Sequence, residues 1–155
     1  MLKSRHRVVP MFAFPIAAIL MMISSAISAA EFGTQAEAKV MLDRAVVALK
    51  ADKGRALDLF TSGNGGFVKG DLYVFCGGSD GLLTAHPYNM GVNLKEFKDK
   101  SGKAAGEEMY AVAEEGKYVE VSYTWVRPGG GEEQVDKSSF ITKVGDQICG
   151  VGYYK

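Results

Sequence analysis

The sequence predicts one α+β domain in which helices pack against an antiparallel sheet. Residues 34–52 repeat apolar side chains at helical spacing, whereas residues 71–154 consist mainly of short runs rich in β-branched and aromatic residues, separated by glycine-containing turns. A second helical stretch, residues 103–115, interrupts these runs. The order is therefore helix, two strands, helix, three strands. About five antiparallel strands with the helices against one face is the most economical packing of that order.

The first helix has a capping signal at its start. Thr34 and Glu37 have the spacing of a capping box, in which a hydroxyl and a carboxylate satisfy the free amide groups of a helix N-terminus. Gly54 is expected to break this helix after about Asp52, and residues 55–60 to form a short second one. The apolar positions at helical spacing are Ala38, Met41, Leu42, Ala45, Val46 and Leu49.

Five segments are expected to be strands, and one further helix connects them. The connecting helix, residues 103–115, is expected to end at Gly116, because glycine is favoured just past a helix C-terminus. Turn residues separate the strand candidates from one another. The expected strands are residues 71–77, 82–86, 117–127, 134–144 and 147–154.

Residues 1–30 have the pattern of a secretory signal peptide. A basic lead precedes the apolar run of residues 8–23, and small residues follow it up to a cleavage point after Ala30 or, as second choice, Ala29. The alternative is an uncleaved membrane anchor, although the run is short for a bilayer span of about 20 residues and contains two prolines. We therefore expect a periplasmic or secreted protein with one domain, residues 31–155.

The charge balance argues against nucleic acid as a partner. The chain has 18 basic and 18 acidic side chains, and Lys3, Arg5 and Arg7 lie in the expected signal peptide, so the remainder would carry a net charge of −3. It contains no run of basic residues of the kind that binds phosphate backbones. Nucleic acid is therefore not an expected partner.

Catalytic and cofactor motifs give little support for an enzyme. His86 is the sole histidine of residues 31–155, so any acid–base scheme depends on it. The sequence has no haem or phosphate-binding signature and too few ligands for a zinc site. We expect no cofactor and no catalysis. The two cysteines, Cys76 and Cys149, would form a disulfide in an oxidising compartment or remain as buried free thiols.

Seven short pieces of the chain occur in the order and at the spacing of a known family. They are FVKGDLYVF at 67–75, DG at 80–81, TAHP at 84–87, GVNL at 91–94, YTW at 123–125, KSSF at 137–140 and GVGYY at 150–154. Together they resemble single Cache domains of the short bacterial type. The resemblance implies a PAS-like fold, with a long N-terminal helix packed on a central five-stranded antiparallel sheet and a connecting helix.

The resemblance also bears on the cysteines. In the Cache topology the first and last strands lie side by side in the middle of the sheet, and here these strands hold Cys76 and Cys149. The resemblance therefore makes a disulfide the expected outcome. In the chain-entropy model, closing a loop this long stabilises a fold by about 4 kcal/mol.

Cache domains usually form the extracytoplasmic part of a chemoreceptor or sensor kinase and hold small organic molecules, often short carboxylates. The resemblance therefore implies a small anionic ligand and a role in signal transduction or chemotaxis. Because the sequence stops at Lys155 without a transmembrane helix or transmitter domain, a membrane sensor or chemoreceptor is expected as partner. Two alternatives stay open: a docking module without a small ligand, and a small exported enzyme with His86 as general base.

The expected pocket combines a histidine, a lysine with a hydroxyl, and two aromatic residues. His86 can donate to a carboxylate, and Lys137 and Ser139 share one strand face that suits an anion. Tyr123 and Trp125 share a face of the neighbouring strand and can form a wall. The alternatives are a histidine that caps a strand end, a solvated edge lysine and aromatics of the core. Weaker aromatic candidates are Tyr88, Tyr73 and Tyr153.

Overall fold

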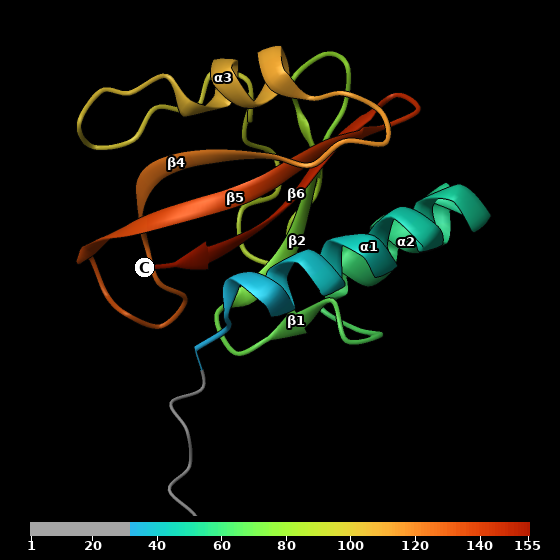
Figure 1. The fold of residues 1–155 in the computed structure, drawn as a ribbon, viewed down its shortest axis with the longest axis horizontal. Helices are drawn as coiled ribbons and strands as arrows, with labels where there is room; N and C mark the ends of the chain where they lie inside the picture. Colours follow the sequence, from blue (N-terminus) through green and yellow to red (C-terminus); the bar gives the residue numbers. More distant parts are fainter. Residues whose placement is uncertain (1–31) are drawn as a thin grey trace, which may run out of the picture.

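The computed structural model describes residues 32–155, in three layers. A six-stranded antiparallel sheet forms the middle layer, with α1 (Gln35–Ala51) and α2 (Lys53–Ser62) on one face and α3 (Ala105–Val112) on the other (Figure 1). The predicted signal peptide, residues 1–30, lies outside the described residues. No helix within residues 32–155 is long and apolar enough to span a membrane.

The sheet has the strand order β1-β2-β6-β5-β4, and β3 pairs with β2 beside this path. The first long strand, β2, and the last strand, β6, are therefore neighbours, as the Cache resemblance implied. The two-residue strand β1 was not expected. The strands are β1 (Val68–Lys69), β2 (Leu72–Gly77), β3 (Leu83–Ala85), β4 (Val119–Val126), β5 (Gln134–Val144) and β6 (Gln147–Tyr154).

The N-terminal helix is divided into two pieces at Asp52. The capping box of Thr34 and Glu37 is present at the start of α1. Asp52 has an extended backbone (φ −158°, ψ 99°), and its carboxylate accepts the backbone N–H of Arg55 at 3.0 Å, which starts α2. The prediction that Gly54 breaks the helix is therefore wrong, because Asp52 ends α1 and caps α2 and Gly54 lies within α2.

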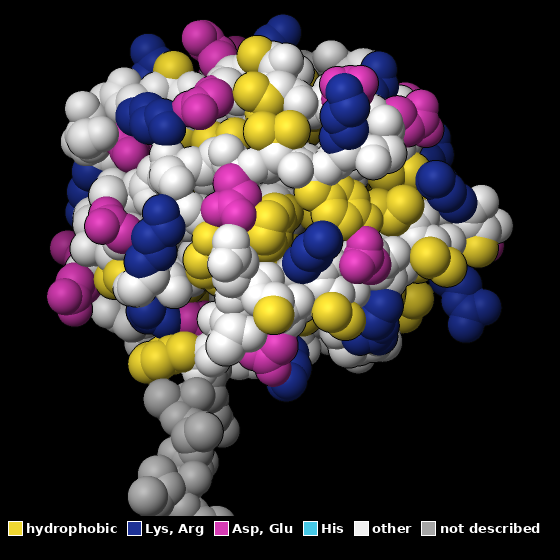
Figure 2. Space-filling model, viewed as in Figure 1, with side chains coloured by type: hydrophobic (Ala, Val, Ile, Leu, Met, Phe, Trp, Pro, Cys, Tyr) yellow, Lys and Arg dark blue, Asp and Glu magenta, His cyan; other side chains and the backbone are white. Residues whose placement is uncertain are grey.

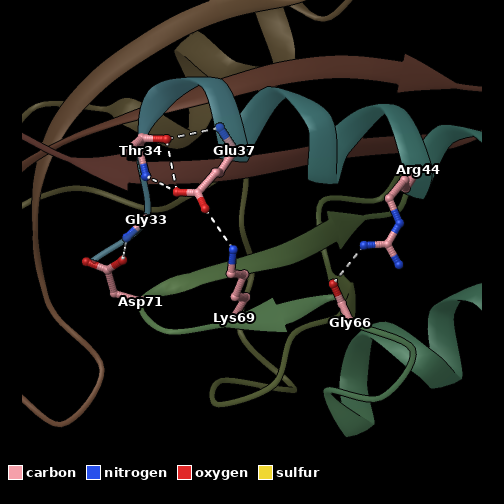
Figure 3. A network of polar contacts seen from close by, with 7 residues as sticks. All are labelled: Gly33, Thr34, Glu37, Arg44, Gly66, Lys69 and Asp71. Carbon is pink, nitrogen blue, oxygen red and sulfur yellow. Dashed lines mark hydrogen bonds and ion pairs between the residues drawn. The ribbon is translucent and has the colours of Figure 1, made fainter. Parts of the chain in front are cut away.

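Polar contacts fasten the start of α1 to the β1–β2 hairpin (Figure 3). The Glu37 carboxylate accepts from Lys69 Nζ at 2.7 Å, and the Gly33 N–H donates to Asp71 at 2.6 Å. Two turns further on, Arg44 donates to backbone carbonyls of the loop before β1. These contacts hold α1 across β1 and β2, so the helix covers the middle of the sheet.

The sheet separates two cores, and this arrangement corrects one expectation. Leu72, Val74 and Cys76 of β2 point to the α1 side, whereas Tyr73 and Phe75 point to the α3 side. Every residue of β2 and β6 is buried, because helices or loops cover both faces. The prediction of helices on one face alone is therefore wrong. The continuous apolar run of β2 is typical of a strand buried on both sides.

The connecting helix is shorter than expected and is packed tightly. It ends at Val112, because the backbone of Ala113 is extended. Residues 113–116 then run beside β5, with a bridge between Glu115 and Lys143. Gly116 therefore does not cap the helix. At Gly106 a Cβ atom would lie 1.9 Å from the carbonyl oxygen of Leu94, so only glycine allows α3 to lie this close to the preceding loop.

Cys76 and Cys149 form the expected disulfide. They are register partners on β2 and β6, with a Cα–Cα distance of 4.1 Å, and both are fully buried on the α1 side. The bond links positions 73 residues apart in the sequence. It therefore crosslinks the beginning and the end of the sheet at its centre.

Candidate functional site

A cavity lies between the α3 side of the sheet, α3 and the loops that follow β3. Its volume is about 160 Å³. A cavity of about 150 Å³ accommodates a molecule the size of benzene, so the space suits a small organic compound. The lining residues are Tyr73, Phe75, Leu83, His86, Asn89, Val92, Leu94, Phe97, Met109, Tyr123 and Trp125. Most of them are apolar, and none is an acid, a lysine or an arginine.

His86 is held as a hydrogen-bond donor toward this cavity. Its Nδ1 accepts the backbone N–H groups of Tyr88 at 3.0 Å and Asn89 at 3.1 Å. Nδ1 therefore carries the lone pair, and the proton of the neutral ring is on Nε2. Burial, together with the positive charge of Lys137, lowers the pKa of His86 to about 4. A neutral ring whose lone pair is occupied suits donation to a ligand and does not suit a general base.

Lys137 lies behind the cavity wall and is 1% exposed. Its Nζ donates to the hydroxyl of Tyr73 at 2.8 Å and to that of Tyr154 at 3.4 Å, and it lies over both rings, 4.2 Å and 4.6 Å from their centroids. Within residues 32–155 no carboxylate is within ion-pair distance of Nζ. Burial lowers the pKa of Lys137 to about 7, with Asp71 raising it and Arg127 lowering it.

The packing of β6 makes room for this lysine. A Cβ atom at Gly152 would lie 2.2 Å from Cε of Lys137 and 2.5 Å from Oγ of Ser139. Only glycine at this position therefore lets the aliphatic part of the lysine cross β6 toward Tyr73 on β2. Gly152 is the third residue of the GVGYY segment, residues 150–154, on which the sequence resemblance partly rests.

One carboxylate and two basic side chains lie beside Tyr73 and Tyr154; Asp71 and Lys137 are buried, and Arg127 is half-buried. We call Asp71, Arg127 and Lys137 the cationic cluster. The Asp71 carboxylate pairs with Arg127 and also accepts the N–H of Gly33, next to the start of α1 (Figure 3). The Arg127 guanidinium is 4.5 Å from the centroid of the Tyr154 ring. With all three groups ionised the cluster carries one uncompensated positive charge.

The structure brings some of the predicted site residues to the cavity and places others around it. His86, Tyr123 and Trp125 line the cavity, whereas Lys137 and Ser139 lie buried behind it. Ser139 is hydrogen-bonded to the Tyr123 hydroxyl at 2.8 Å, and burial raises the pKa of Tyr123 to about 12. The alternative of a solvated edge lysine does not hold for Lys137.

The weaker aromatic candidates are distributed over three places. Tyr88 is 52% exposed and borders a neighbouring hollow, which Trp125 and Arg127 also line. Tyr73 lines the cavity and separates it from Lys137. Tyr153 belongs to the core on the α1 side, so it is not part of this site.

Sequence reasoning did not identify several wall residues or the cationic cluster as a unit. Phe75 could have been found, because it lies two positions after Tyr73 on the same strand and therefore shares its face. Asp71 and Arg127 are 56 positions apart, and no spacing rule connects them. The other wall residues that were not named are Leu83, Asn89, Val92, Leu94, Phe97 and Met109.

Comparison with known protein families shows to which family this chain belongs. Residues 16–148 match the family described as Single Cache domain 2. The chain belongs to the single Cache domain family. The Cache fold is also seen in a methyl-accepting chemotaxis protein from Vibrio parahaemolyticus RIMD 2210633, with a TM-score of 0.60 and 22% identity over 77% of this chain and 86% of that one. No curated protein sequence matches this Cache domain.

Two further solved structures have the same fold. One is a Cache chemosensory domain described for its recognition of carboxylic acids, with a TM-score of 0.55 and 22% identity over 75% of this chain and 84% of that one. The other is the periplasmic sensor domain of a chemotaxis protein, with a TM-score of 0.55 and 20% identity over 75% and 86% of the two chains. At these identities the likeness concerns the fold, and the ligand has to be argued from the cavity itself.

Proposed function

We propose that this Cache domain is an extracytoplasmic binding protein that captures a small organic anion in the cavity beside Tyr73 and His86. The observation that carries the proposal is the buried amine of Lys137, which has no ion-pair partner among the described residues, next to an uncharged cavity of the right size for a small metabolite. A short carboxylate is the simplest ligand with these properties.

Electrostatics supports this choice of ligand. A buried ammonium group without a carboxylate partner destabilises the folded protein, and an anion nearby offsets that cost. The positive charge of Lys137 contributes to the lowered pKa of His86, so its field reaches a residue of the cavity wall. Hydrogen bonds to a charged ligand contribute about 1.5–3 kcal/mol each.

The two ends of the cavity suit the two ends of such a ligand. The carboxylate would lie at the side of Tyr73 and His86, where Nε2–H of His86 is free to donate. His86 and Tyr73 are adjacent, with ring centroids 5.0 Å apart. The body of the ligand would lie against Phe75, Leu83 and Met109, which are apolar and buried.

We further propose that the protein acts outside the cytosol and passes its signal to a membrane sensor or chemoreceptor. A signal peptide over residues 1–30 would export it. The intact mass of the purified exported protein tests this: a product that starts at Glu31 is expected. A product that retains residues 1–30 would instead indicate an anchor, and the family match does extend back to residue 16.

Thermal unfolding against a panel of short carboxylates, amino acids and polyamines tests the proposed ligand class. A ligand at about 100 times its Kd adds about 2.7 kcal/mol of stability, which raises the Tm of a domain of this size by several degrees. We expect a rise with carboxylates that is lost in Lys137→Met. Lys143→Met is the matched control, because Lys143 is exposed on the same strand.

The same experiment can contradict the proposal. If no compound of the panel changes the Tm of the protein purified free of ligand, the domain is better explained as a docking module. If carboxylates raise the Tm equally in the protein and in Lys137→Met, the cationic cluster does not provide the binding energy.

A further inference from the structure

The segment that leads from the β2–β3 turn to α3, residues 82–103, exposes a group of large apolar side chains. It holds four of the seven large apolar residues that are exposed within residues 32–155. Single apolar side chains are normal on a protein surface, whereas a group of them indicates an interaction surface. The four residues, with their exposed fractions, are Leu82 (48%), Tyr88 (52%), Met90 (49%) and Val92 (50%).

Hydrogen bonds hold the backbone of this segment in place. Leu82 and Asn93 form an antiparallel bridge, and the N–H of Leu83 donates to the carbonyl of Val92 at 2.9 Å. On the inner side, the buried side chains of Leu83 and Leu94 line the cavity. The outer apolar side chains are therefore presented on an ordered backbone, which lowers the entropy cost of binding.

The same segment is basic in a domain that is otherwise acidic. Residues 82–103 hold four lysines and two carboxylates, whereas the other described residues hold 11 basic and 15 acidic side chains. Of the two carboxylates, that of Asp99 is buried and accepts backbone N–H groups. Lys95, Lys98 and Lys100 are exposed. The outer side of the segment therefore has a local excess of positive charge.

The apolar residues of this segment are also separated from acidic ones along the chain. Between Asp80 and Glu96 there is no acidic residue, so this stretch can approach an anionic surface without burying a negative charge of its own. The exposed Val40 and Val47 of α1 differ in this respect, because Asp43 lies within about one helical turn of both. Of these two exposed apolar groups, the 82–103 segment is the one that complements an anionic surface.

We infer that residues 82–103 form a membrane-contact surface, with their apolar side chains in the headgroup layer of a bilayer and their lysines against anionic lipid headgroups. Tyrosine is enriched at membrane interfaces, and lysine can keep its ammonium group at the headgroups while its stem covers apolar surface. A second copy of the domain fits less well, since a symmetric contact would bring the lysines of two segments together. The inference does not depend on the ligand of the cavity.

Sedimentation with lipid vesicles tests this inference. The protein expressed from its full sequence is mixed with vesicles of phosphatidylcholine or of a two-to-one mixture of phosphatidylcholine and phosphatidylglycerol. Each lysine near an anionic surface strengthens binding roughly fivefold, so we expect at least about tenfold tighter binding to the mixed vesicles. High salt should reduce this difference, because it screens the charges.

A matched pair of double variants tests the apolar contact. Leu82→Ser/Met90→Ser should weaken binding to the mixed vesicles at least about fivefold, because less apolar surface enters the bilayer. Val40→Ser/Val47→Ser should leave binding unchanged, although these residues of α1 are at least as exposed. Thermal unfolding of both variants checks that the fold is retained.

A matched pair of triple variants tests the charge contact. Lys95→Gln/Lys98→Gln/Lys100→Gln should remove most of the preference for the mixed vesicles. The preference should remain when three exposed lysines elsewhere in the domain are changed in the same way, in Lys39→Gln/Lys50→Gln/Lys143→Gln.

Oxidation of Met90 gives a readout that holds even if residues 1–30 are retained and anchor the protein to every vesicle. Met90 is exposed, so dilute peroxide should oxidise it readily in the absence of lipid. We expect this oxidation to be at least about threefold slower on the mixed vesicles than on phosphatidylcholine. Met41 and Met109 are buried and serve as internal references that react slowly on both.

The outcomes separate this inference from the proposed function. Equal sedimentation with both kinds of vesicle, together with equal oxidation of Met90, would overturn the membrane contact and would favour a protein partner for the segment. Equal losses in the test variants and in their controls would also overturn it. The proposed ligand binding would stand in each case, because it is measured without lipid.

Discussion

The α1 side of the sheet packs its core directly against two helices, whereas the α3 side has a cavity among its core residues, with the buried Lys137 behind the cavity wall. On the α1 side, Leu72, Val74 and the disulfide of Cys76 pack directly against helices, and the core is continuous. On the α3 side, Tyr73 and Phe75 from the same strand face a space of about 160 Å³. One strand thus supports both faces, and we expect the α1 side to contribute mainly stability and the α3 side to provide the proposed binding site.

The distribution of charged side chains also distinguishes the surface of the molecule from the interior beside the cavity. Lys/Arg and Asp/Glu side chains are interspersed over the face of the molecule in Figure 2, without a large area of one sign. The imbalance of charge lies inside, where Lys137 is almost fully buried and Arg127 is paired with Asp71. Selectivity for an anion is therefore expected to come from the interior beside the cavity.

Loss of the disulfide is expected to have the largest effect, and to act on the α1 side. Reduction should lower the free energy of unfolding by about 4 kcal/mol, because the crosslink restricts a long loop of the unfolded chain. Chemical denaturation with and without reductant measures this. The double variant Cys76→Ala/Cys149→Ala should be insensitive to reductant. Two titratable thiols in the native, unreduced protein would contradict the assignment of the bond.

Asp71→Asn is expected to have the next largest effect, because the Asp71 carboxylate contacts both Gly33, next to the start of α1, and Arg127 of the cationic cluster. Removing the charge leaves Arg127 and Lys137 without a carboxylate, at a cost of about 1.5–3 kcal/mol in unfolding free energy, because a hydrogen bond to a charged group is lost. The excess positive charge should at the same time tighten anion binding. Denaturation and calorimetry on the same variant measure both effects.

A matched control for Asp71→Asn is Asp146→Asn. Asp146 pairs with Lys53 on the surface, where both side chains are more than half exposed. Surface ion pairs contribute little, so stability and binding should stay unchanged. If Asp71→Asn also left both quantities unchanged, the cationic cluster would not link the two sides of the sheet.

Over a single pH unit, the smallest expected effect is the pH dependence that Lys137 imposes on the α3 side. Its pKa falls from 10.5 to about 7 on folding, so between these values the unfolded chain holds a proton that the folded chain has lost. Stability should therefore rise with pH across this window, by at most about 1.4 kcal/mol per pH unit. The comparison of the protein with Lys137→Met from pH 7 to 9, without ligand, isolates this contribution. Parallel curves would show that burial does not lower the pKa of Lys137.

The local elements could be predicted closely because their signals are local. The capping box of Thr34 and Glu37 determines where α1 starts, and β5 and β6 have the predicted bounds, 134–144 and 147–154. The sequence analysis placed the break between α1 and α2 at Gly54, whereas it lies at Asp52. A glycine within a helix is tolerated, so Gly54 need not break it. The extended backbone of Asp52 leaves no signal in the spacing of apolar residues from which helices are predicted. The face on which α3 lies was also not predictable from its own sequence.

Apart from the short strand β1, the sequence by itself determined the order and type of the elements, the family and the residue types available for a site. Only the tertiary structure decided that Lys137 points at Tyr73, 64 positions away, and that Asp71 pairs with Arg127, 56 positions away. The physical reason is that secondary structure follows from periodicity and capping within a few residues. The charge balance of a buried site instead depends on which side chains the strand order brings to one face of the sheet.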